Sequence, residues 1–413
     1  MSPCPSATVP VRAPGRSLTA LLPRRFHLPV TASITLSFLA GSSAPTPLYP
    51  VYQAMWRFSS TTLTLVFASY VVVLLGALLV FGRLSDHVGR KPVILLATLM
   101  QVGAMALFAT AGGVFALFAG RILQGFATGA AIGAIGAAML DIDRDRGTVA
   151  NAVAPALGTA VGGFGSGLLV HFLSAPALLV YEVLTALYLL QALAILWLPE
   201  PGRARPGAWS SLRPQLAVPA SVRPALRAAV PVLVAGWAMA GFYASLGPAL
   251  VKGVFGFDAS LGGGTALFLL AGSAGIAVFV LQALAPERLV RLGARALSIG
   301  SLIVLYALVQ RSLLLFVLGT IVAGVGFGTG FQGGVRTVLA NATPSQSAGV
   351  LSVLFVVSYL AMGLPAVIAG WTTVRTGNLA VVAYGFAAAV FALALLAWRV
   401  GSRSPIRRPR WFL

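Results

Sequence analysis

Long apolar runs separated by short polar segments dominate this sequence. A helix that crosses a bilayer needs about 20 mostly apolar residues, at about 1.5 Å of rise per residue. Because the runs are continuous rather than alternating, they predict helices and not barrel strands. The twelve runs cover 28–47, 61–81, 92–111, 114–139, 149–171, 175–198, 229–251, 262–285, 294–310, 312–335, 348–370 and 379–398.

The ninth run is the short one, with fifteen residues between Arg295 and Arg311. We expect this helix to begin before Arg295, to thin the bilayer, or to let its arginines reach the interface.

The composition agrees with a chain immersed in lipid. Hydrophobic residues make up 58% and charged residues 9% of the 413 positions, whereas a soluble domain carries about 25% charged residues. The single cysteine, Cys4, argues against a secreted disulfide scaffold. The predicted fold class is therefore an all-α integral membrane protein with twelve transmembrane helices in two six-helix bundles.

The distribution of charge predicts the orientation. The net charge is +20, but the basic residues form short clusters between apolar runs, which does not fit a nucleic-acid partner. On one predicted side lie 23 of them, and four lie on the other: Arg57, Lys252, Arg311 and Arg375. The positive-inside rule then predicts a multi-pass protein of the cell inner (plasma) membrane with both termini cytoplasmic. Abundant Arg and Ala with little Lys indicate a bacterial source.

Five segments follow from these runs. Residues 1–27 are predicted to be a disordered cytoplasmic tail rather than a signal peptide. Residues 28–198 form an N-terminal six-helix bundle, and 229–400 form a C-terminal one. The Pro- and Arg-rich residues 199–228 form a cytoplasmic linker between them, and 401–413 form a basic cytoplasmic tail.

A charged glycine-containing string joins the second and third runs. Its glycines allow a tight turn, and its single acid lies among basic residues with which it can form charge-assisted bonds. Membrane topology alone explains the basic residues but not Asp86. The string is Gly82-Arg83-Leu84-Ser85-Asp86-His87-Val88-Gly89-Arg90-Lys91.

This string resembles the signature that the major facilitator superfamily carries between its second and third spans. Arg121-Ile122-Leu123-Gln124-Gly125 is similar to the same family's Arg-x-x-Gln-Gly pattern. Gly158-Thr159-Ala160-Val161-Gly162-Gly163 resembles its antiporter motif, with Thr159 where proline is expected. The resemblance implies a monomeric transporter of small molecules in a lipid bilayer. It also implies a gating latch formed by Gly82, Asp86, Gly89, Arg90 and Lys91, with Asp86 facing a helix N-terminus of the other half.

Two charged residues lie inside the apolar runs. Arg121 in the fourth and Glu182 in the sixth have nearly the same predicted depth, and charges in such positions normally face a partner or a cavity. We expect the two to approach each other, with Glu182 carrying the proton and Arg121 holding down its pKa. The alternatives are a static pair, or Glu182 reaching the interface while Arg121 bonds to carbonyls.

Small residues mark predicted packing seams. Gly125, Gly129 and Gly133 lie four apart, as in closely packed membrane helices. Gly158, Gly162 and Gly163 belong to the same class. The tenth run holds seven glycines, Gly326 and Gly330 among them. For that run the sequence leaves packing and a bending element equally open.

Polar and aromatic residues on spans four, five, seven, ten and eleven are the candidates for a substrate cavity. As a set they suggest an aromatic, weakly polar cavity suited to an amphipathic or aromatic solute. Each alone is also explained by an interhelical hydrogen bond. They are Gln124, Asn151, Trp237, Tyr243, Gln332, Ser358 and Tyr359.

Other functions have less support in the sequence. The three histidines lie apart, and Asp141, Asp143 and Asp145 alternate with arginines, so we expect no enzyme site, metal or cofactor. A channel or a receptor fits two six-span halves less well than alternating access does. Proton-coupled export is the leading prediction, although no acid lies between Val30 and Pro50, where many proton-coupled drug exporters have one. A proton-coupled importer or a facilitator of a small metabolite is the alternative.

Overall fold

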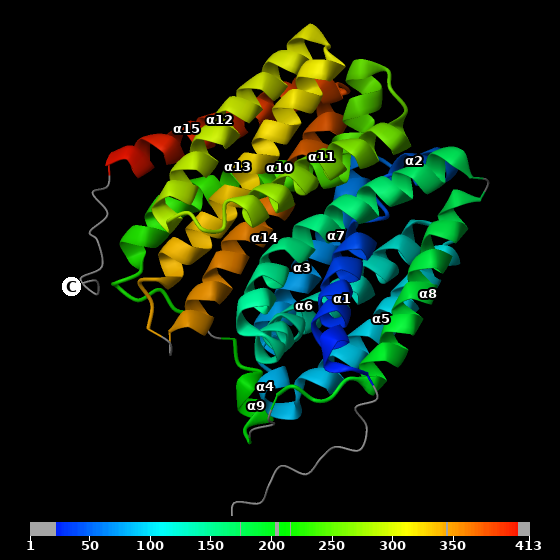
Figure 1. Ribbon diagram of the computed structural model, residues 1–413. Coiled ribbons are helices and arrows are strands. Elements are labelled where there is room, and N and C mark those ends of the chain that lie inside the picture. Colours follow the sequence, from blue (N-terminus) through cyan, green and yellow to red (C-terminus); the bar gives the residue numbers. More distant parts are fainter. Residues whose placement is uncertain (1–21, 174, 203–205, 215, 344–345, 404–413) are drawn as a thin grey trace, which may run out of the picture.

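The computed structural model describes residues 22–173, 175–202, 206–214, 216–343 and 346–403 (Figure 1). These residues are helical without strands, which confirms the all-α prediction. Eleven of the described helices are long and apolar enough to cross a membrane. Most of the two predicted tails, 1–21 and 404–413, lies outside the described residues.

The elements fall before and after the Pro-rich connection. The first group is η1 (Arg24–Phe26), α1 (His27–Ser43), α2 (Tyr49–Trp56), α3 (Ser60–Phe81), α4 (Ser85–Val88), α5 (Arg90–Ala109), α6 (Val114–Ile142), α7 (Arg144–Phe172) and α8 (Pro176–Trp197). The short α9 (Ala208–Ser211) lies within the connection. The second group is α10 (Arg223–Phe255), α11 (Ala259–Val280), α12 (Pro286–Gln310), α13 (Leu313–Leu339), α14 (Ser347–Thr376) and α15 (Leu379–Arg403).

Three boundaries differ from the predicted runs. α1 ends at Ser43 instead of reaching residue 47, because Pro45 and Pro47 have no N–H to donate to the preceding turn. With 17 residues it is shorter than the eleven spanning helices. α12 begins at Pro286, ahead of Arg295, which is the first of the three expectations for the ninth run. α10 begins at Arg223, inside the segment predicted as linker.

The helices of each group pack mainly with one another, and two helix pairs join the groups. In the first half α6 packs on α3 and α5, and α7 packs on α1; in the second, α12 packs on α13 and α15. Across the halves α7 packs along α11, and α3 along α14 (Figure 1). Counted among the long helices, the fifth contacts the eighth and the second contacts the eleventh. Exchanging the halves converts one pair into the other, as expected of a repeated architecture.

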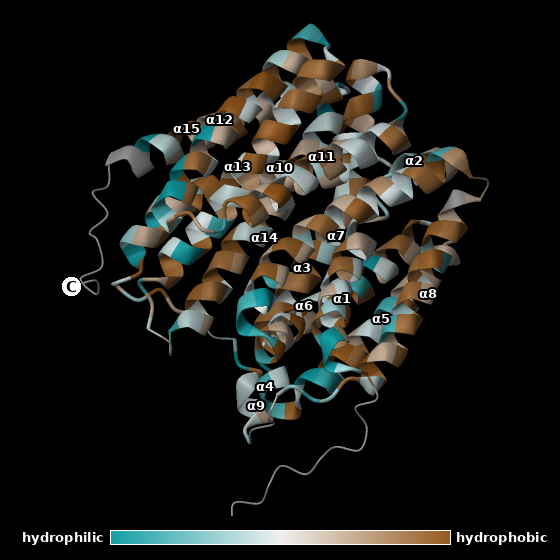
Figure 2. Ribbon diagram, in the orientation of Figure 1, coloured by the Kyte–Doolittle hydropathy of each residue, from teal (hydrophilic) through white to brown (hydrophobic). Residues whose placement is uncertain are grey.

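Apolar residues cover the middle of the helices, and polar residues gather near their ends (Figure 2). We call the side on which α4, α9 and the connection lie the linker side, and the opposite side, near α2, the far side (Figure 1). Large apolar side chains such as Leu190 and Ile276 are more than half exposed. Such side chains are satisfied when they face lipid.

Candidate functional site

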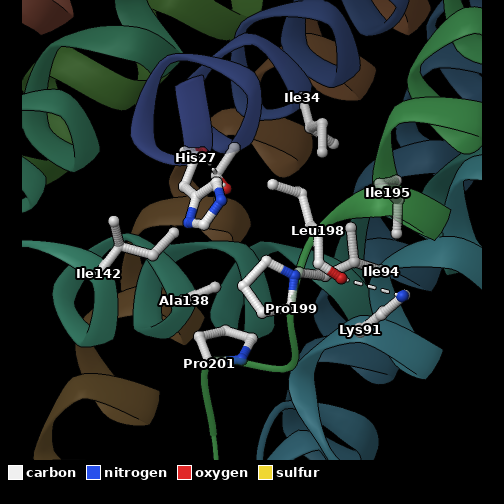
Figure 3. Close-up of a pocket in the computed structure, with 11 residues that line it drawn as sticks. His27, Ile34, Lys91, Ile94, Ala138, Ile142, Ile195, Leu198, Pro199 and Pro201 are labelled. Atoms are coloured by element: carbon white, nitrogen blue, oxygen red, sulfur yellow. Dashed lines mark hydrogen bonds between the residues drawn. The ribbon is translucent and has the colours of Figure 1, made fainter. Parts of the chain in front are cut away.

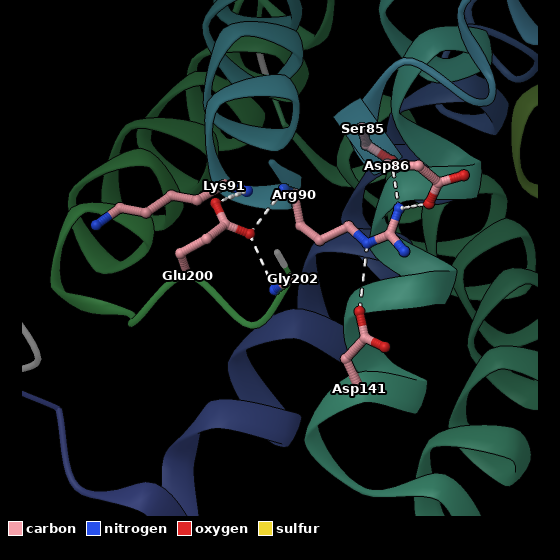
Figure 4. Close-up of polar contacts among 7 residues, drawn as sticks. All are labelled: Ser85, Asp86, Arg90, Lys91, Asp141, Glu200 and Gly202. Carbon is pink, nitrogen blue, oxygen red and sulfur yellow. Dashed lines mark hydrogen bonds and ion pairs between the residues drawn. The ribbon is translucent and has the colours of Figure 1, made fainter. Parts of the chain in front are cut away.

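The loop between α3 and α5 contains a compact ion-pair network on the linker side (Figure 4). Arg90 pairs through Nη1 with Asp86 and donates a hydrogen bond to Ser85 Oγ at 2.8 Å. Its Nε donates to Asp141 Oδ2 of α6 at 3.3 Å. A guanidinium that engages three partners in this way fixes the loop against the end of α6.

Glu200, just after α8, caps the start of α5 and was missed by the sequence analysis. Its carboxylate accepts hydrogen bonds from the backbone N–H groups of Arg90 and Lys91, at 2.8 and 3.0 Å (Figure 4). A carboxylate is favourable at a helix N-terminus because unpaired N–H groups gather there. Glu200 stands between two prolines and is one of only eight acids in the chain, which was the available signal.

Gly89 and Lys91 also help to hold the start of α5 against the end of α8. Gly89 has φ +100°, which favours glycine, and a Cβ there would lie 2.8 Å from Glu200 Oε2. Lys91 Nζ donates to the carbonyls of Leu196 and Leu198 at 2.7 and 2.9 Å, at the end of α8. Glu200 thus places a negative charge at the N-terminus of α5, and Lys91 places a positive charge at the C-terminus of α8, as the helix dipoles favour.

The predicted contact of Asp86 with the second half is absent here. In the part of the chain that the structure describes, Asp86, Arg90 and Lys91 make their hydrogen bonds and ion pairs only with the first half and the α8–α10 connection. Gly82 packs within the first half too, since its carbonyl oxygen lies 3.1 Å from where a Cβ of Gly133 would be.

Polar contacts between the halves lie on the far side instead. Thr46 Oγ1 donates to the Ala244 carbonyl at 2.9 Å, between the α1–α2 turn and α10. Thr61 Oγ1 at the start of α3 donates to the Gly370 carbonyl near the end of α14 at 3.4 Å. Within the residues that the structure describes, the polar contacts between the two halves therefore lie on the far side.

An ion pair also joins the halves on the far side. His171 Nδ1, near the end of α7, lies 3.6 Å from Asp258 Oδ1, which also caps the start of α11 by accepting from Leu261 N. Both side chains are partly exposed.

Arg121 lies at the end of α1, not beside Glu182. It is fully buried, and its guanidinium donates to the Ser42 carbonyl and to Gln124 Oε1, both at 2.8 Å, and to the Tyr49 hydroxyl at 2.5 Å. Gln124 Nε2 donates to the Gly41 carbonyl at 2.9 Å. The Gly41 and Ser42 carbonyls belong to the last turn of α1, where Pro45 has no N–H group to donate. Arg121 and Gln124 therefore cap the broken end of the first helix.

The predicted pair of Arg121 and Glu182 is wrong in this structure. Glu182 is exposed on α8, whereas its neighbour Tyr181 is fully buried. One residue along a helix is a rotation of about 100°, so the carboxylate points away from the bundle that buries Tyr181. Arg121 instead lies over the ring of Tyr70, with its guanidinium carbon 5.4 Å from the ring centre.

Tyr52 in the short helix α2 is the other end of this polar region. Its hydroxyl donates to the Tyr181 hydroxyl at 3.1 Å, and its ring stacks on Trp56. Burial raises the pKa of Tyr52 to about 12. The bond therefore joins neutral hydroxyls throughout the physiological range.

The glycines of α6 and α7 lie at close backbone contacts. A Cβ on Gly125 or Gly129 would lie 2.6 Å from the Tyr70 carbonyl oxygen or 2.2 Å from that of Leu74, both on α3. On α7, Gly158 and Gly162 approach α1 in the same way, at 2.3 and 2.1 Å from the Leu36 and Ala40 oxygens. Gly163 instead faces α11, since its own oxygen lies 2.6 Å from a Cβ placed on Gly264. Glycine is what permits such approach between membrane helices.

The glycines of α13 pack against three neighbours, so they need no bend to explain them. Gly326 faces the backbone of α12 at Leu297, and Gly324 and Gly328 face α11 at Leu270 and Ala274. Gly330 faces Val232 of α10, at 2.7 Å from its Cγ2. α13 is a single uninterrupted helix. The seven glycines exceed the need of one interface because α13 has three.

Two predicted cavity residues meet in an aromatic cluster, which we define as Trp237, Phe327, Phe331 and Tyr359. The Trp237 ring lies 5.6, 5.4 and 5.2 Å from the other three, in that order. All four rings are half-buried and lie within α10, α13 and α14. The two phenylalanines were missed by the sequence analysis, although their spacing of four beside Gly326 and Gly330 places them on one face.

One polar atom of the cluster has no partner. Trp237 Nε1 is buried and makes no hydrogen bond with the residues that the structure describes. Gln332 Oε1 and Ser358 Oγ are also buried without a partner, on residues next to Phe331 and Tyr359 in the sequence. Unsatisfied buried polar atoms are costly, at about 1–3 kcal/mol each, and call for a ligand or water.

The remaining cavity predictions do not join this cluster. Gln124 belongs to the cap of α1. Tyr243 bonds to Thr320 Oγ1 at 2.9 Å and stacks on Phe316 inside the second half. Asn151 is exposed on α7, with its amide beside Gly136 of α6. Their polar groups serve helix contacts because the faces that carry them point to neighbouring helices.

A separate cavity of about 30 Å³ lies at the linker-side end of the first half, near His27, Ile94 and Pro199 (Figure 3). It has room for about one or two water molecules, so it is too small for a solute. The described residues contain no group of three metal-ligating side chains.

Known proteins resemble this chain in sequence pattern and in fold. The family model of the Major Facilitator Superfamily matches residues 31–364, whereas no curated protein matches the chain at a significant level. The human organic anion transporter MFSD10 (TETRAN) superposes with a TM-score of 0.66 and 20% identity, over 92% of this chain and 100% of that one.

Two further solved structures are similar. A variant of the nucleoside transporter NupG gives a TM-score of 0.71 with 14% identity, over 92% of this chain and 100% of that one. A variant of the peptide transporter POT in complex with alafosfalin gives 0.69 and 14%, over 92% and 95%. At these identities the likeness concerns the fold.

Proposed function

The chain belongs to the Major Facilitator Superfamily, and from that premise we propose that it moves a small amphipathic or aromatic solute across a membrane by alternating access. The aromatic cluster of Trp237, Phe327, Phe331 and Tyr359 carries this proposal. It is half-buried at mid-helix, and it contains the unpartnered indole N–H of Trp237. Binding sites for small molecules combine such apolar walls with a few polar groups.

The chemistry of the cluster favours an uncharged or weakly charged ring. Aromatic side chains bind flat solutes through offset or edge-to-face contacts, while the indole N–H supplies one donor. None of the four cluster residues is charged. A multiply charged sugar phosphate would need basic groups, and Arg121 is committed to the end of α1.

The contacts that join the two halves on the far side support entry of solute from the linker side. Tyr359 packs against Phe67, Tyr70, Val71 and Leu74 of α3, so the cluster lies against the first half. We propose that the linker side is cytoplasmic, in the inner membrane of a bacterium, because the sequence assigns 23 basic residues to that side and four to the other. In the opposite state the far-side contacts break. The Gly82–Lys91 loop then latches the halves, with Asp86 engaging the second one.

We propose proton-driven export as the direction to test first, and a monomer as the working unit. The resemblance of residues 158–163 to the antiporter motif supports export. A facilitator is the second candidate, because Glu182, the acid inside a predicted span, is exposed and no buried carboxylate occurs in the described residues.

The solute proposal is tested with Trp237→Ala in proteoliposomes, against a panel of labelled aromatic, amphipathic and multiply charged compounds. We expect the wild type to transport members of the first two classes and Trp237→Ala to lose most of that flux. Trp371→Ala is the matched control, since Trp371 lies on α14 but is half exposed and packs on Arg375. Equal flux in wild type and Trp237→Ala would contradict the assignment.

The coupling proposal needs a separate arm with the transported solute. Under an imposed pH gradient, a proton-driven exporter accumulates solute against its concentration gradient in inside-out vesicles. A facilitator only equilibrates it. Equilibration without accumulation would refute proton coupling and leave the solute assignment intact.

A further inference from the structure

One face of α12 is exposed along its length. Ile299, Leu302, Tyr306 and Val309 are 51%, 48%, 55% and 59% exposed. Their spacing of three and four residues places them on a single stripe. In a helix that crosses a membrane, such a stripe of large apolar side chains faces lipid.

Three arginines continue the same stripe toward the linker side. Arg295 precedes Ile299 by four residues, and Arg291 and Arg288 follow at steps of four and three. Arg288 and Arg295 are exposed, and Arg291 is half-buried. Seven residues of helix separate the outermost two, which is about 10 Å. We call these three residues the α12 arginine patch.

The described residues give the patch no hydrogen-bond acceptor and no ion-pair partner. None of its three guanidinium groups forms a hydrogen bond or an ion pair with the residues that the structure describes, and neither does the adjacent carboxylate of Glu287. Arg336, at the end of α13 on the same side, is by contrast satisfied by the carbonyls of Gln282 and Leu284, at 2.9 and 3.3 Å.

Trp398 of α15 fixes the level of the patch at the membrane surface. The Arg295 guanidinium lies 5.7 Å from the centre of the Trp398 ring, which is 37% exposed. Tryptophan prefers the boundary between hydrocarbon and water. Contact with the ring face leaves the N–H edge of the guanidinium free.

We propose that the α12 arginine patch binds the headgroup of an anionic phospholipid, whose acyl chains lie along Ile299, Leu302 and Tyr306. Guanidinium groups bind phosphate oxygens through paired N–H donors. Neighbours three and four apart on a helix are close enough to share one phosphate. The positive-inside rule explains why this loop carries positive charge. It does not explain why three arginines without hydrogen-bond or ion-pair partners lie in line with the lipid-facing stripe. That alignment identifies the ligand as a lipid headgroup.

The test uses the purified full-length chain, stripped of lipid in detergent, with phosphatidylglycerol and phosphatidylcholine as probes in native mass spectrometry. We expect the wild type to retain phosphatidylglycerol selectively. The triple variant Arg288→Gln/Arg291→Gln/Arg295→Gln should lose affinity by roughly fivefold for each arginine removed. The control is Arg24→Gln/Arg213→Gln/Arg227→Gln, which removes the same charge from exposed positions on the same side.

A second measurement keeps every arginine in place. Phosphatidylglycerol with brominated acyl chains should quench tryptophan fluorescence more than brominated phosphatidylcholine does, and Trp398→Phe should abolish that difference. If the triple variant does not fold, Arg295→Gln alone should still show the weaker binding. Equal losses in both triple variants, or quenching that is indifferent to headgroup or to Trp398, would overturn the proposal.

Discussion

The contact between α1 and α7 permits a sharp test with a single methyl group. In Gly162→Ala the new Cβ would lie 2.1 Å from the Ala40 oxygen, and 2.3 and 2.5 Å from its Cα and carbonyl carbon. These are backbone atoms of α1, so no side-chain rotation can relieve the overlap. On the same helix, Gly165 has nothing within 4 Å of an added Cβ. Gly165→Ala therefore introduces the same methyl group without the contact.

The size of the effect follows from the geometry. Ordinary contact for a Cβ begins near 3.4 Å, so α1 and α7 must separate by about 1 Å. A gap of that size forfeits up to about half of the dispersion energy of the facing atoms, and overpacking of this kind costs about 1–3 kcal/mol. Replacing glycine by alanine within a helix otherwise gains about 0.5–1 kcal/mol. Because this gain applies to both variants, we expect Gly162→Ala to be less stable than Gly165→Ala by the overpacking cost of about 1–3 kcal/mol.

Thermal unfolding of the purified protein in a mild detergent measures this difference. An unfolding entropy of about 2.1 cal/mol/K per residue gives a midpoint shift of about 1 °C per kcal/mol for a chain of 413 residues, so the two variants should differ by about 1–3 °C, with Gly165→Ala at or above the wild type. Gly162→Ala unfolding at or above the wild-type temperature would refute the reasoning. So would equal losses in both variants, because they would reflect helix flexibility rather than contact with Ala40.

Four further substitutions test charged residues. Arg121→Met removes three hydrogen bonds at about 0.6 kcal/mol each, so unfolding in detergent should show a loss of about 2 kcal/mol, and wild-type stability would contradict its role as a cap. His171→Gln and Asp258→Asn should each raise labelling of far-side cysteines introduced in a background without Cys4, and labelling at the wild-type level in both variants would exclude this pair as a far-side contact. Glu182→Gln should leave both the unfolding midpoint and pH-driven transport unchanged, since its side chain is exposed, and a loss of coupling would restore its predicted role.

Hydropathy was sufficient for the elements of the fold, and the charged string between the second and third runs indicated the family. Eleven of the predicted runs contain helices long and apolar enough to cross a membrane, because lipid immersion requires each segment to satisfy its own backbone within one continuous apolar helix. The differences at helix ends have local causes, as with Pro45 just after α1 and Pro286 at the first position of α12.

The candidate site was only partly predictable. Trp237 and Tyr359 were correctly brought together, but Phe327 and Phe331 complete their cluster. Which neighbour a residue meets depends on the rotation of its helix and on distant segments. Sequence spacing along one run does not contain that information.

The sequence by itself determined that this chain lies in lipid, where its helices run, and which loop carries the family's charged turn, because these properties depend on local composition and spacing. Tertiary structure decided that Arg121 caps the end of α1 instead of pairing with Glu182. It also decided that Glu200, just after α8, caps the start of α5. A rotation of about 100° per residue separates a buried Tyr181 from an exposed Glu182, and only the packing of α8 against its neighbours fixes which of the two faces inward.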